Sequence, residues 1–269
     1  MTNLILAAVL IHSALFSIPE DRAPFLSDLP QNEMILTILF DNYASDDRLA
    51  TGWGFAALLE AGDHTILFDT GADGSALLEN MKILGKDPLA VEAVVISHAH
   101  GDHTGGLQAL FDLGLRPRLY VLSAFPDAFH QTVAGAAQVL EASPGQEIIP
   151  GVLTTGQVGK AIPEQALVLK TREGAVVLTG CAHPGAVQMA EAAQAVLSGP
   201  LHGILGGFHL MQASLEEIED VIWSFREMGV KVAGPTHCSG EMAMDLFRES
   251  YGQNFILLGS GRVLRLSTD

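Results

Sequence analysis

The residues best suited to chemistry in this chain lie at positions 98–103, which read H-A-H-G-D-H. Four side chains that can bind a metal fall within these six positions: His98, His100, Asp102 and His103. Imidazole nitrogen and carboxylate oxygen are ligands that zinc and similar divalent ions accept in proteins. In an extended segment, residues i and i+2 point the same way, so His98 and His100 can bind one ion together. We expect Asp102 and His103, where the chain turns, to face a second ion beside the first.

The segments on either side predict how this run is positioned. An apolar run over 93–97 precedes it, and T-G-G-L at 104–107 continues into a helical pattern. The pattern predicts a buried strand that ends directly before the run and a helix that begins after it. Because loops held by rigid elements often carry binding residues, we interpret the run as a metal-binding loop. The alternative is a polar loop whose histidines are merely solvated.

Further motifs follow along the chain. They are F-D-T-G at 68–71, T-G-C-A-H-P-G at 179–185, G-G-F-H-L at 206–210 and P-T-H-C-S-G at 235–240. Together with the H-x-H-x-D-H run, they resemble the metallo-β-lactamase fold superfamily from about residue 34 to the C-terminus. The last three resemble its dihydropterin ribofuranosylaminobenzene-phosphate synthase-like branch, which is a family label rather than an activity. The resemblance implies an α/β fold, an αββα sandwich of two mixed β-sheets flanked by helices.

The resemblance also implies a dinuclear metal centre at one edge of the sheets. His183 would complete the first metal site and His237 the second, since each follows a predicted strand. Cys181 stands where many members have a bridging aspartate, and it is either a thiolate ligand or a small buried side chain. Asp69 is expected behind the site, where a carboxylate fixes the tautomer of a ligand histidine. The cofactors implied are two divalent metal ions, zinc by preference, with iron or manganese as alternatives.

Two residues are candidates for catalysis. Asp102 can bind a metal and also accept a hydrogen bond from the attacking hydroxide, which two divalent ions would generate by lowering the pKa of water toward about 7. His209 follows a predicted strand over 201–205. It is an additional ligand, an acid that gives a proton to the leaving group, or a residue near the site with no chemical task.

These residues predict a metal-dependent hydrolase that acts on a small ester, lactone, amide or phosphoester. The alternatives are an iron-dependent redox enzyme or dioxygenase on the same fold, and a non-catalytic metal-binding module. The net charge is −17, from 14 basic and 31 acidic residues. This charge opposes nucleic-acid binding, which depends on neutralising phosphates. The expected partner is therefore a small-molecule substrate and no nucleic acid.

The sequence predicts that the chain has two parts, an N-terminal segment and one folded domain. Residues 4–18 are apolar but too few for a stable membrane span, so 1–30 is predicted to be a signal segment or an N-terminal extension. No Lys or Arg precedes the apolar stretch, and no clear cleavage site follows it. Export to the periplasm is the prediction, and a cytoplasmic protein with an N-terminal helix is the alternative. Residues 31–269 are predicted to form one domain, since 48% of the chain is apolar and no long linker divides it.

Strands and helices alternate along the predicted domain. The predicted strands lie at 34–40, 54–59, 65–68, 93–97, 119–122, 147–149, 166–169, 176–179, 201–205 and 231–233, with two more short strands at the C-terminus. The predicted helices lie at 75–84, 185–197, 215–228 and 241–251, whereas 123–142 has mixed helix and turn signals.

Overall fold

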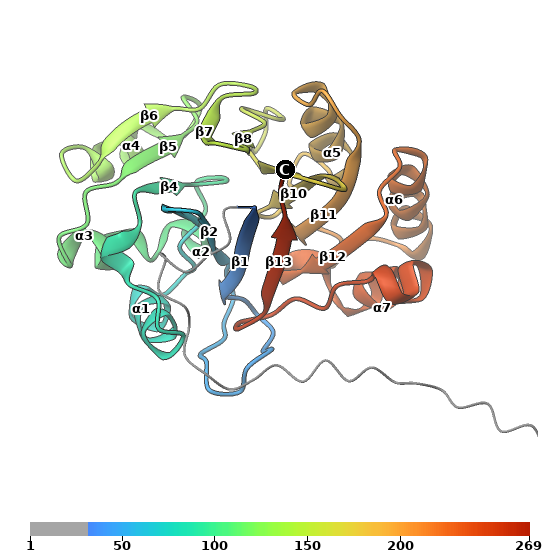
Figure 1. Cartoon of the computed structure of the whole chain (residues 1–269), viewed down its shortest axis with the longest axis horizontal. Helices are drawn as coiled ribbons and strands as arrows, with labels where there is room; N and C mark the ends of the chain where they lie inside the picture. The colour runs from blue at the N-terminus through green and yellow to red at the C-terminus, as the bar shows by residue number, and fades with distance from the viewer. Residues whose placement is uncertain (1–31) are drawn as a thin grey trace, which may run out of the picture.

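Two mixed β-sheets pack face to face, and helices cover their outer faces (Figure 1). The computed structural model describes residues 32–269. The predicted signal or N-terminal segment over 1–30 lies outside the described residues. Among the described residues, no helix combines the length and the apolar character needed to cross a membrane. The predicted αββα sandwich is confirmed.

The first sheet has the strand order β13-β1-β2-β3-β4-β5-β6. Its strands are β1 (Glu33–Phe40), β2 (Ala56–Ala61), β3 (His64–Phe68), β4 (Ala93–Val95), β5 (Arg118–Val121), β6 (Gln138–Glu141) and β13 (Val263–Ser267). Pairing is antiparallel from β13 to β3 and parallel from β3 to β6. The last strand of the chain therefore pairs with the first described strand.

The second sheet has the strand order β12-β11-β10-β9-β8-β7. Its strands are β7 (Glu147–Ile149), β8 (Val152–Thr154), β9 (Leu167–Thr171), β10 (Gly174–Thr179), β11 (Leu201–Gly207) and β12 (Val232–Thr236). Strands β10, β11 and β12 are parallel, and the others pair antiparallel. Both sheets thus contain a parallel half, and parallel strands bring their carboxyl ends to the same edge.

Helices cover the outer faces of both sheets. On the first sheet lie α1 (Gly74–Ile83), α2 (Gly101–Thr104), α3 (Leu107–Asp112) and α4 (Asp127–Val133); on the second lie α5 (Ala186–Ala195), α6 (Leu215–Glu227) and α7 (Glu241–Tyr251). Short 3₁₀ turns occur as η2 (Pro88–Ala90), η3 (His237–Ser239) and η4 (Gly252–Asn254). Helix α6 begins at a capping box, in which Ser214 and Glu217 satisfy each other's backbone N–H groups.

Strand β1 shows how the sequence builds the layers. Leu36 and Ile38 point into the core between the two sheets, whereas Leu39 points into the core between the first sheet and its helices. Successive side chains of a strand alternate between faces, so a strand that is apolar on both faces fits between two layers. The same alternation in β10 places Leu178 between the sheets and Val177 under the helices of the second sheet.

The elements differ from the sequence predictions mainly where strands are short or exposed. Strand β6 was not predicted, because its side chains are largely exposed and show no apolar alternation. Strand β8 was not predicted either; it has three residues and follows β7 after only two residues. Of the two predicted C-terminal strands, only β13 forms; residues near 255 make a single bridge from Phe255 to Ala233 instead.

The core between the sheets gives a first prediction. Leu36 is fully buried there, so Leu36→Ala should lower the free energy of unfolding by about 2–5 kcal/mol through lost burial and the cavity left behind. Urea denaturation followed by circular dichroism measures this. The control Leu89→Ala removes a side chain that is 57% exposed and should cost far less. Equal losses for the two variants would contradict this packing.

Candidate metal centre

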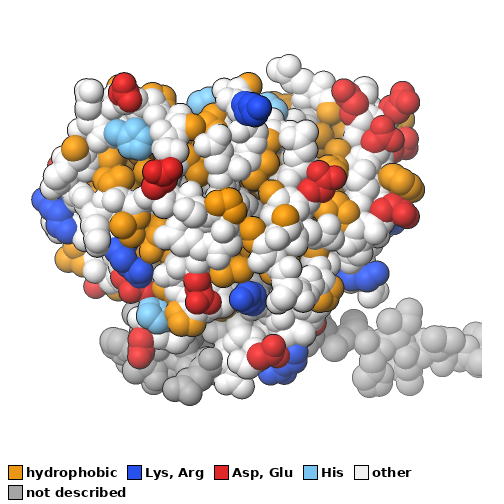
Figure 2. Space-filling model, turned by 90° about the horizontal axis from the view of Figure 1, so that it is seen from above, with side chains coloured by type: hydrophobic (Ala, Val, Ile, Leu, Met, Phe, Trp, Pro, Cys, Tyr) orange, Lys and Arg blue, Asp and Glu red, His pale blue; other side chains and the backbone are white. Residues whose placement is uncertain are grey.

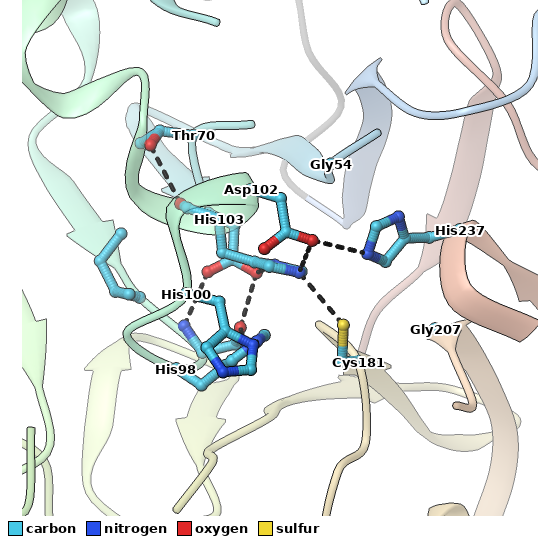
Figure 3. A network of polar contacts seen from close by, with 12 residues as sticks. Gly54, Thr70, His98, His100, Asp102, His103, Cys181, Gly207 and His237 are labelled. Carbon is cyan, nitrogen blue, oxygen red and sulfur yellow. Dashed lines mark hydrogen bonds and ion pairs between the residues drawn. The ribbon is translucent and has the colours of Figure 1, made fainter. Parts of the chain in front are cut away.

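The predicted ligands lie at the carboxyl ends of strands from both sheets. The loop after β4 carries His98, His100, Asp102 and His103; the loop after β10 carries Cys181 and His183; His237 follows β12 directly. Figure 3 shows the side chains from these three segments pointing toward one another. The structure therefore brings together all seven residues that the sequence offered as ligands, although they are up to 139 positions apart, from 98 to 237.

His98 stands at the centre of the first group of donor atoms. Its Nε2 lies 3.1 Å from Nδ1 of His100 and 3.2 Å from Nε2 of His183. Burial, followed by the charges of the neighbouring imidazoles, holds the pKa of His98 well below its usual value. Burial and His209 likewise lower the pKa of His183 to about 4. Both imidazoles are therefore neutral near pH 7, which is the form that binds metals.

The second group consists of Asp102, His103, Cys181 and His237, whose donor atoms all lie within 4.8 Å of one another. Oδ2 of Asp102 lies 3.5 Å from Nε2 of His103 and 3.4 Å from Nε2 of His237. Sγ of Cys181 lies 3.2 Å from Nε2 of His103. Figure 3 shows these three contacts as dashed lines.

Cys181 lies near both groups, at the position that the family resemblance implied for a bridging residue. It also belongs to a set with His98 and His183 whose donor atoms lie within 4.8 Å of one another. The same holds for Asp102, which forms such a set with His98 and His100. The thiol and the carboxylate thus both lie between the two histidine groups, which is the place of a bridging ligand.

The arrangement fits divalent cations. Donor separations of 3.1–3.5 Å match the spacing of about 3.3 Å that ligands have around a tetrahedral zinc ion. Nε2 of His237 is buried and makes no hydrogen bond within residues 32–269. A buried nitrogen without a partner is costly, and a metal ion would satisfy it. Nitrogen, oxygen and sulfur donors together form a set that divalent transition-metal ions and zinc accept.

Asp69 supports the site from behind, as the sequence predicted. This fully buried carboxylate accepts hydrogen bonds from the backbone N–H and the hydroxyl of Ser97, both at 2.7 Å, and contacts Nδ1 of His103 at 2.7 Å. Ser97 Oγ in turn lies 2.9 Å from Nδ1 of His98. Burial opposes a charged His103, but the charge and hydrogen bond of Asp69 outweigh it and raise the pKa of His103. One carboxylate therefore orients a histidine in each group.

Two supporting residues were missed by the sequence analysis. Asn42 Oδ1 lies 2.9 Å from Nδ1 of His237, and Glu164 accepts hydrogen bonds from the backbone N–H groups of Cys181, Ala182 and His183 at 2.8–2.9 Å. Asn42 follows the end of β1 by two residues, so its position past a strand end was a usable signal. Glu164 has no local motif, because its role comes from contacts 17 to 19 residues away.

The backbone is unusual at the same edge. The non-glycine residues with positive φ in the described part of the chain are Asp69 (55°), Ala182 (60°), His209 (54°) and His237 (51°). This left-handed conformation is uncommon for such residues, and it persists where the surrounding contacts enforce it. All four follow strand ends at the site, so the unusual backbone lies in the segments that carry or adjoin the candidate ligands.

Two glycines allow the loops to approach closely. A Cβ at Gly180 would lie 2.1 Å from Oγ of Ser97, and one at Gly207 would lie 2.3 Å from the carbonyl oxygen of Gly180. Neither position can accept a larger residue without moving the backbone. The glycines of the T-G-C and G-G-F motifs are therefore explained by packing at the site.

His209 lies beside the first group, with its ring centroid 4.3 Å from that of His183. Its ring nitrogen, Cys181 Sγ and Cys238 Sγ form a further set of donor atoms within 4.8 Å of one another. A hydrogen bond with Cys238 raises the pKa of His209, and one with Cys181 lowers the pKa of Cys238. The exposed His209 thus approaches the buried metal-centre residues from the solvent side.

The chain belongs to the metallo-beta-lactamase superfamily, whose family model matches residues 53–188. This confirms the predicted membership. Superfamily membership implies that the chain binds divalent metal, and the clusters described above are suited to it.

Individual relatives extend the likeness to most of the chain. The chain is 26% identical to the 7,8-dihydropterin-6-methyl-4-(beta-D-ribofuranosyl)-aminobenzene-5'-phosphate synthase of Methanocaldococcus jannaschii, over 87% of this chain and 97% of that one. The crystal structure of Tm1679, a metal-dependent hydrolase of the beta-lactamase superfamily, is 28% identical with a TM-score of 0.73, covering 87% of this chain and 99% of that one. YhfI from Bacillus subtilis shares the fold at 18% identity and a TM-score of 0.63, over 87% of this chain and 99% of that one.

The contact between Asp69 and His103 gives a second prediction. Asp69→Asn should weaken zinc binding by about 10- to 100-fold, because the amide cannot supply the same charge to the ligand histidine. Zinc titration of the metal-free protein by calorimetry measures this. Asp73→Asn is the control, since asparagine caps a helix as well as aspartate does and Asp73 caps α1. Unchanged zinc affinity in Asp69→Asn would show that Asp69 has no such role.

Asp41 gives a third prediction, on pH. Its buried carboxylate accepts hydrogen bonds from Thr236 and Tyr43, and burial raises its pKa to about 6. Between about pH 4 and 6 the folded metal-free chain then binds more protons than the unfolded chain, so Asp41 makes stability fall by about 3 kcal/mol as pH rises through this window. Asp41→Asn should flatten that fall. Urea denaturation from pH 4 to 7 tests it, and a variant curve parallel to the original would contradict it.

Proposed function

We propose that this chain is a metal-dependent hydrolase that binds two divalent cations and acts on a small ester, lactone, amide or phosphoester. The observation that carries the proposal is the pair of adjoining donor groups, with Cys181 and Asp102 between them. Residues 31–269 would act as one domain. We also propose that the N-terminal segment, residues 1–30, directs export of the protein.

The proposed ligands divide between the two cations as follows. His98, His100 and His183 would hold one ion; Asp102, His103 and His237 would hold the other; Cys181 would contact both. Zinc suits this set best, with iron or manganese as alternatives. When bound, two such ions lower the pKa of water and stabilise negative charge that develops on the substrate.

Two residues of the chain would handle protons. Burial raises the pKa of Asp102, but the 3.4 Å contact with His237 and the charge of His103 outweigh it and hold that pKa below its usual value. Its carboxylate is therefore ionised and can accept a hydrogen bond from an attacking water molecule. His209 lies at the solvent side of His183, a position suited to giving a proton to the leaving group.

The charge of the chain supports a small-molecule substrate. Asp and Glu side chains crowd one end of the face shown in Figure 2, toward the side where Figure 1 places α6 and α7. With a net charge of −17, the chain would repel a polyphosphate backbone. We therefore propose that nucleic acid is not a substrate.

We do not extend the synthase activity of the archaeal relative to this chain. That relative's name includes a 5'-phosphate. The cavity beside His209 and Cys238 has neither Lys nor Arg among the described residues that line it. Such a cavity offers no Lys or Arg to pair with a phosphate group.

Removal of metal gives a fourth prediction. Chelation should abolish hydrolysis across a panel of esters, lactones, β-lactams and phosphodiesters, and zinc or manganese should restore it. Asp102→Ala should lower the restored activity by at least about 100-fold, since a ligand and a proton acceptor are lost together. Full activity after chelation would refute the proposal.

The control for this experiment is Asp112→Ala, which removes an exposed carboxylate that accepts a hydrogen bond from the side chain of Gln108. It should retain full activity.

Metal analysis of protein purified without added metal tests the alternative, an iron-dependent redox enzyme. Two irons per chain with a visible absorption band would favour redox chemistry over hydrolysis.

A further inference from the structure

A cavity of about 490 Å³ lies directly beside the candidate metal centre. His209 and Cys238, which share a donor cluster with Cys181, are part of its lining. Pockets for small ligands in proteins usually have volumes of about 300–1,000 Å³. The cavity can therefore hold the part of a substrate that extends away from the reacting bond.

The other walls of the cavity are mainly apolar. They are formed by Trp53, Leu210, Met211 and Val221, among others. Trp53 is 51% exposed and Met211 is 48% exposed. Large apolar side chains exposed around a hollow are typical of a binding site, and a flexible thioether adapts to the shape of its ligand.

The backbone that follows Trp53 lies against the loop over 98–103. The backbone N–H of Phe55 donates to the carbonyl oxygen of Asp102 at 3.2 Å, and a Cβ at Gly54 would lie 2.6 Å from that same oxygen. The indole ring lies 5.0 Å from the ring of His237, tilted by 51°. An aromatic face thus lies beside a proposed ligand, on a backbone segment that contacts the loop over 98–103.

The charges around the cavity disfavour anions. None of the described residues that line it is Lys or Arg, whereas Glu217 is among them. Oε2 of Glu217 accepts hydrogen bonds from the backbone N–H and the hydroxyl of Ser214, at 2.7 and 2.8 Å. Glu217 is therefore held as an anion at the cavity wall. A negatively charged group would meet a carboxylate there, and among the described lining residues only His209, beside His183, can become cationic.

We propose that this cavity binds an uncharged aromatic group of the substrate, which stacks on Trp53 while the reacting bond lies at the histidines. The orientation of the substrate, with its reacting bond at the histidines, rests on the proposed function. The binding of the aromatic group to the cavity does not depend on hydrolysis. It narrows the substrate class to molecules with an aromatic, uncharged portion next to the bond that is cleaved.

Calorimetric titration with 1-naphthol and with a 1-naphthol sulfonate tests the proposal on both metal-loaded and metal-free protein. We expect 1-naphthol to bind both forms, and the sulfonate to bind the metal-free form more weakly. Trp53→Ala should raise the Kd for 1-naphthol by about 3- to 10-fold, which is the range for loss of an aromatic pair. Trp53→Phe should recover most of the affinity, because a stacking face is restored.

Trp223→Ala is the matched control. Trp223 lies on α6, is 63% exposed and does not line this cavity, so its removal should leave the Kd unchanged. The metal content of each variant is measured, because Trp53 contacts His237. Equal binding of the sulfonate and 1-naphthol to metal-free protein, or an unchanged Kd in Trp53→Ala, would overturn the proposal.

Comparing the hydrolysis of 1-naphthyl acetate with that of ethyl acetate distinguishes the proposed aromatic-binding cavity from the proposed hydrolase activity. We expect Trp53→Ala to raise KM for the naphthyl ester more than for the ethyl ester. If 1-naphthol binds as expected but no compound in the panel is hydrolysed, the cavity assignment stands and the hydrolase proposal fails.

Discussion

The contacts of the Asp69 carboxylate organise the rest of the site. Its two oxygens contact Ser97 and His103 directly, and the hydroxyl of Ser97 contacts the ring of His98. A fully buried carboxylate is tolerated only when hydrogen bonds compensate for its loss of water. The contacts that stabilise Asp69 are thus the same contacts that fix the histidine rings. Removing this carboxylate would leave both donor groups without the support that aims them.

The second requirement is that two sheets deliver their loops to the same edge. Strands β3 and β4 are parallel in one sheet, and β10, β11 and β12 are parallel in the other. Their carboxyl ends meet where the residues with positive φ and the close-approach glycines lie. The core between the sheets holds these ends in register, so backbone strain at the edge is balanced by apolar packing elsewhere.

The site has two chemically different sides. Its buried side is made of imidazoles, a carboxylate and a thiol, supported by Asp69, Glu164 and Asn42. Its open side is made of His209, Trp53 and an apolar cavity beside an anionic Glu217. The buried side suits cations, and the open side suits an uncharged group. This division explains how a strongly acidic chain can present a cation-binding centre and an apolar pocket within a few ångströms of each other.

The sequence by itself determined the loop over 98–103, the strands that precede the other motifs and the layered fold. Local periodicity and ligand spacing indicate the loop and the strands, whereas the family resemblance implied the layered fold and assigned His183 and His237 to the same centre. Only the tertiary structure showed that Cys181 lies in both donor groups, that Glu164 holds its loop, and that Trp53 faces the cavity. No local pattern marks Glu164 or Trp53, and the motif around Cys181 left open whether this residue is a ligand. Their roles come from contacts between segments far apart in the chain, and such contacts exist only once both sheets have packed.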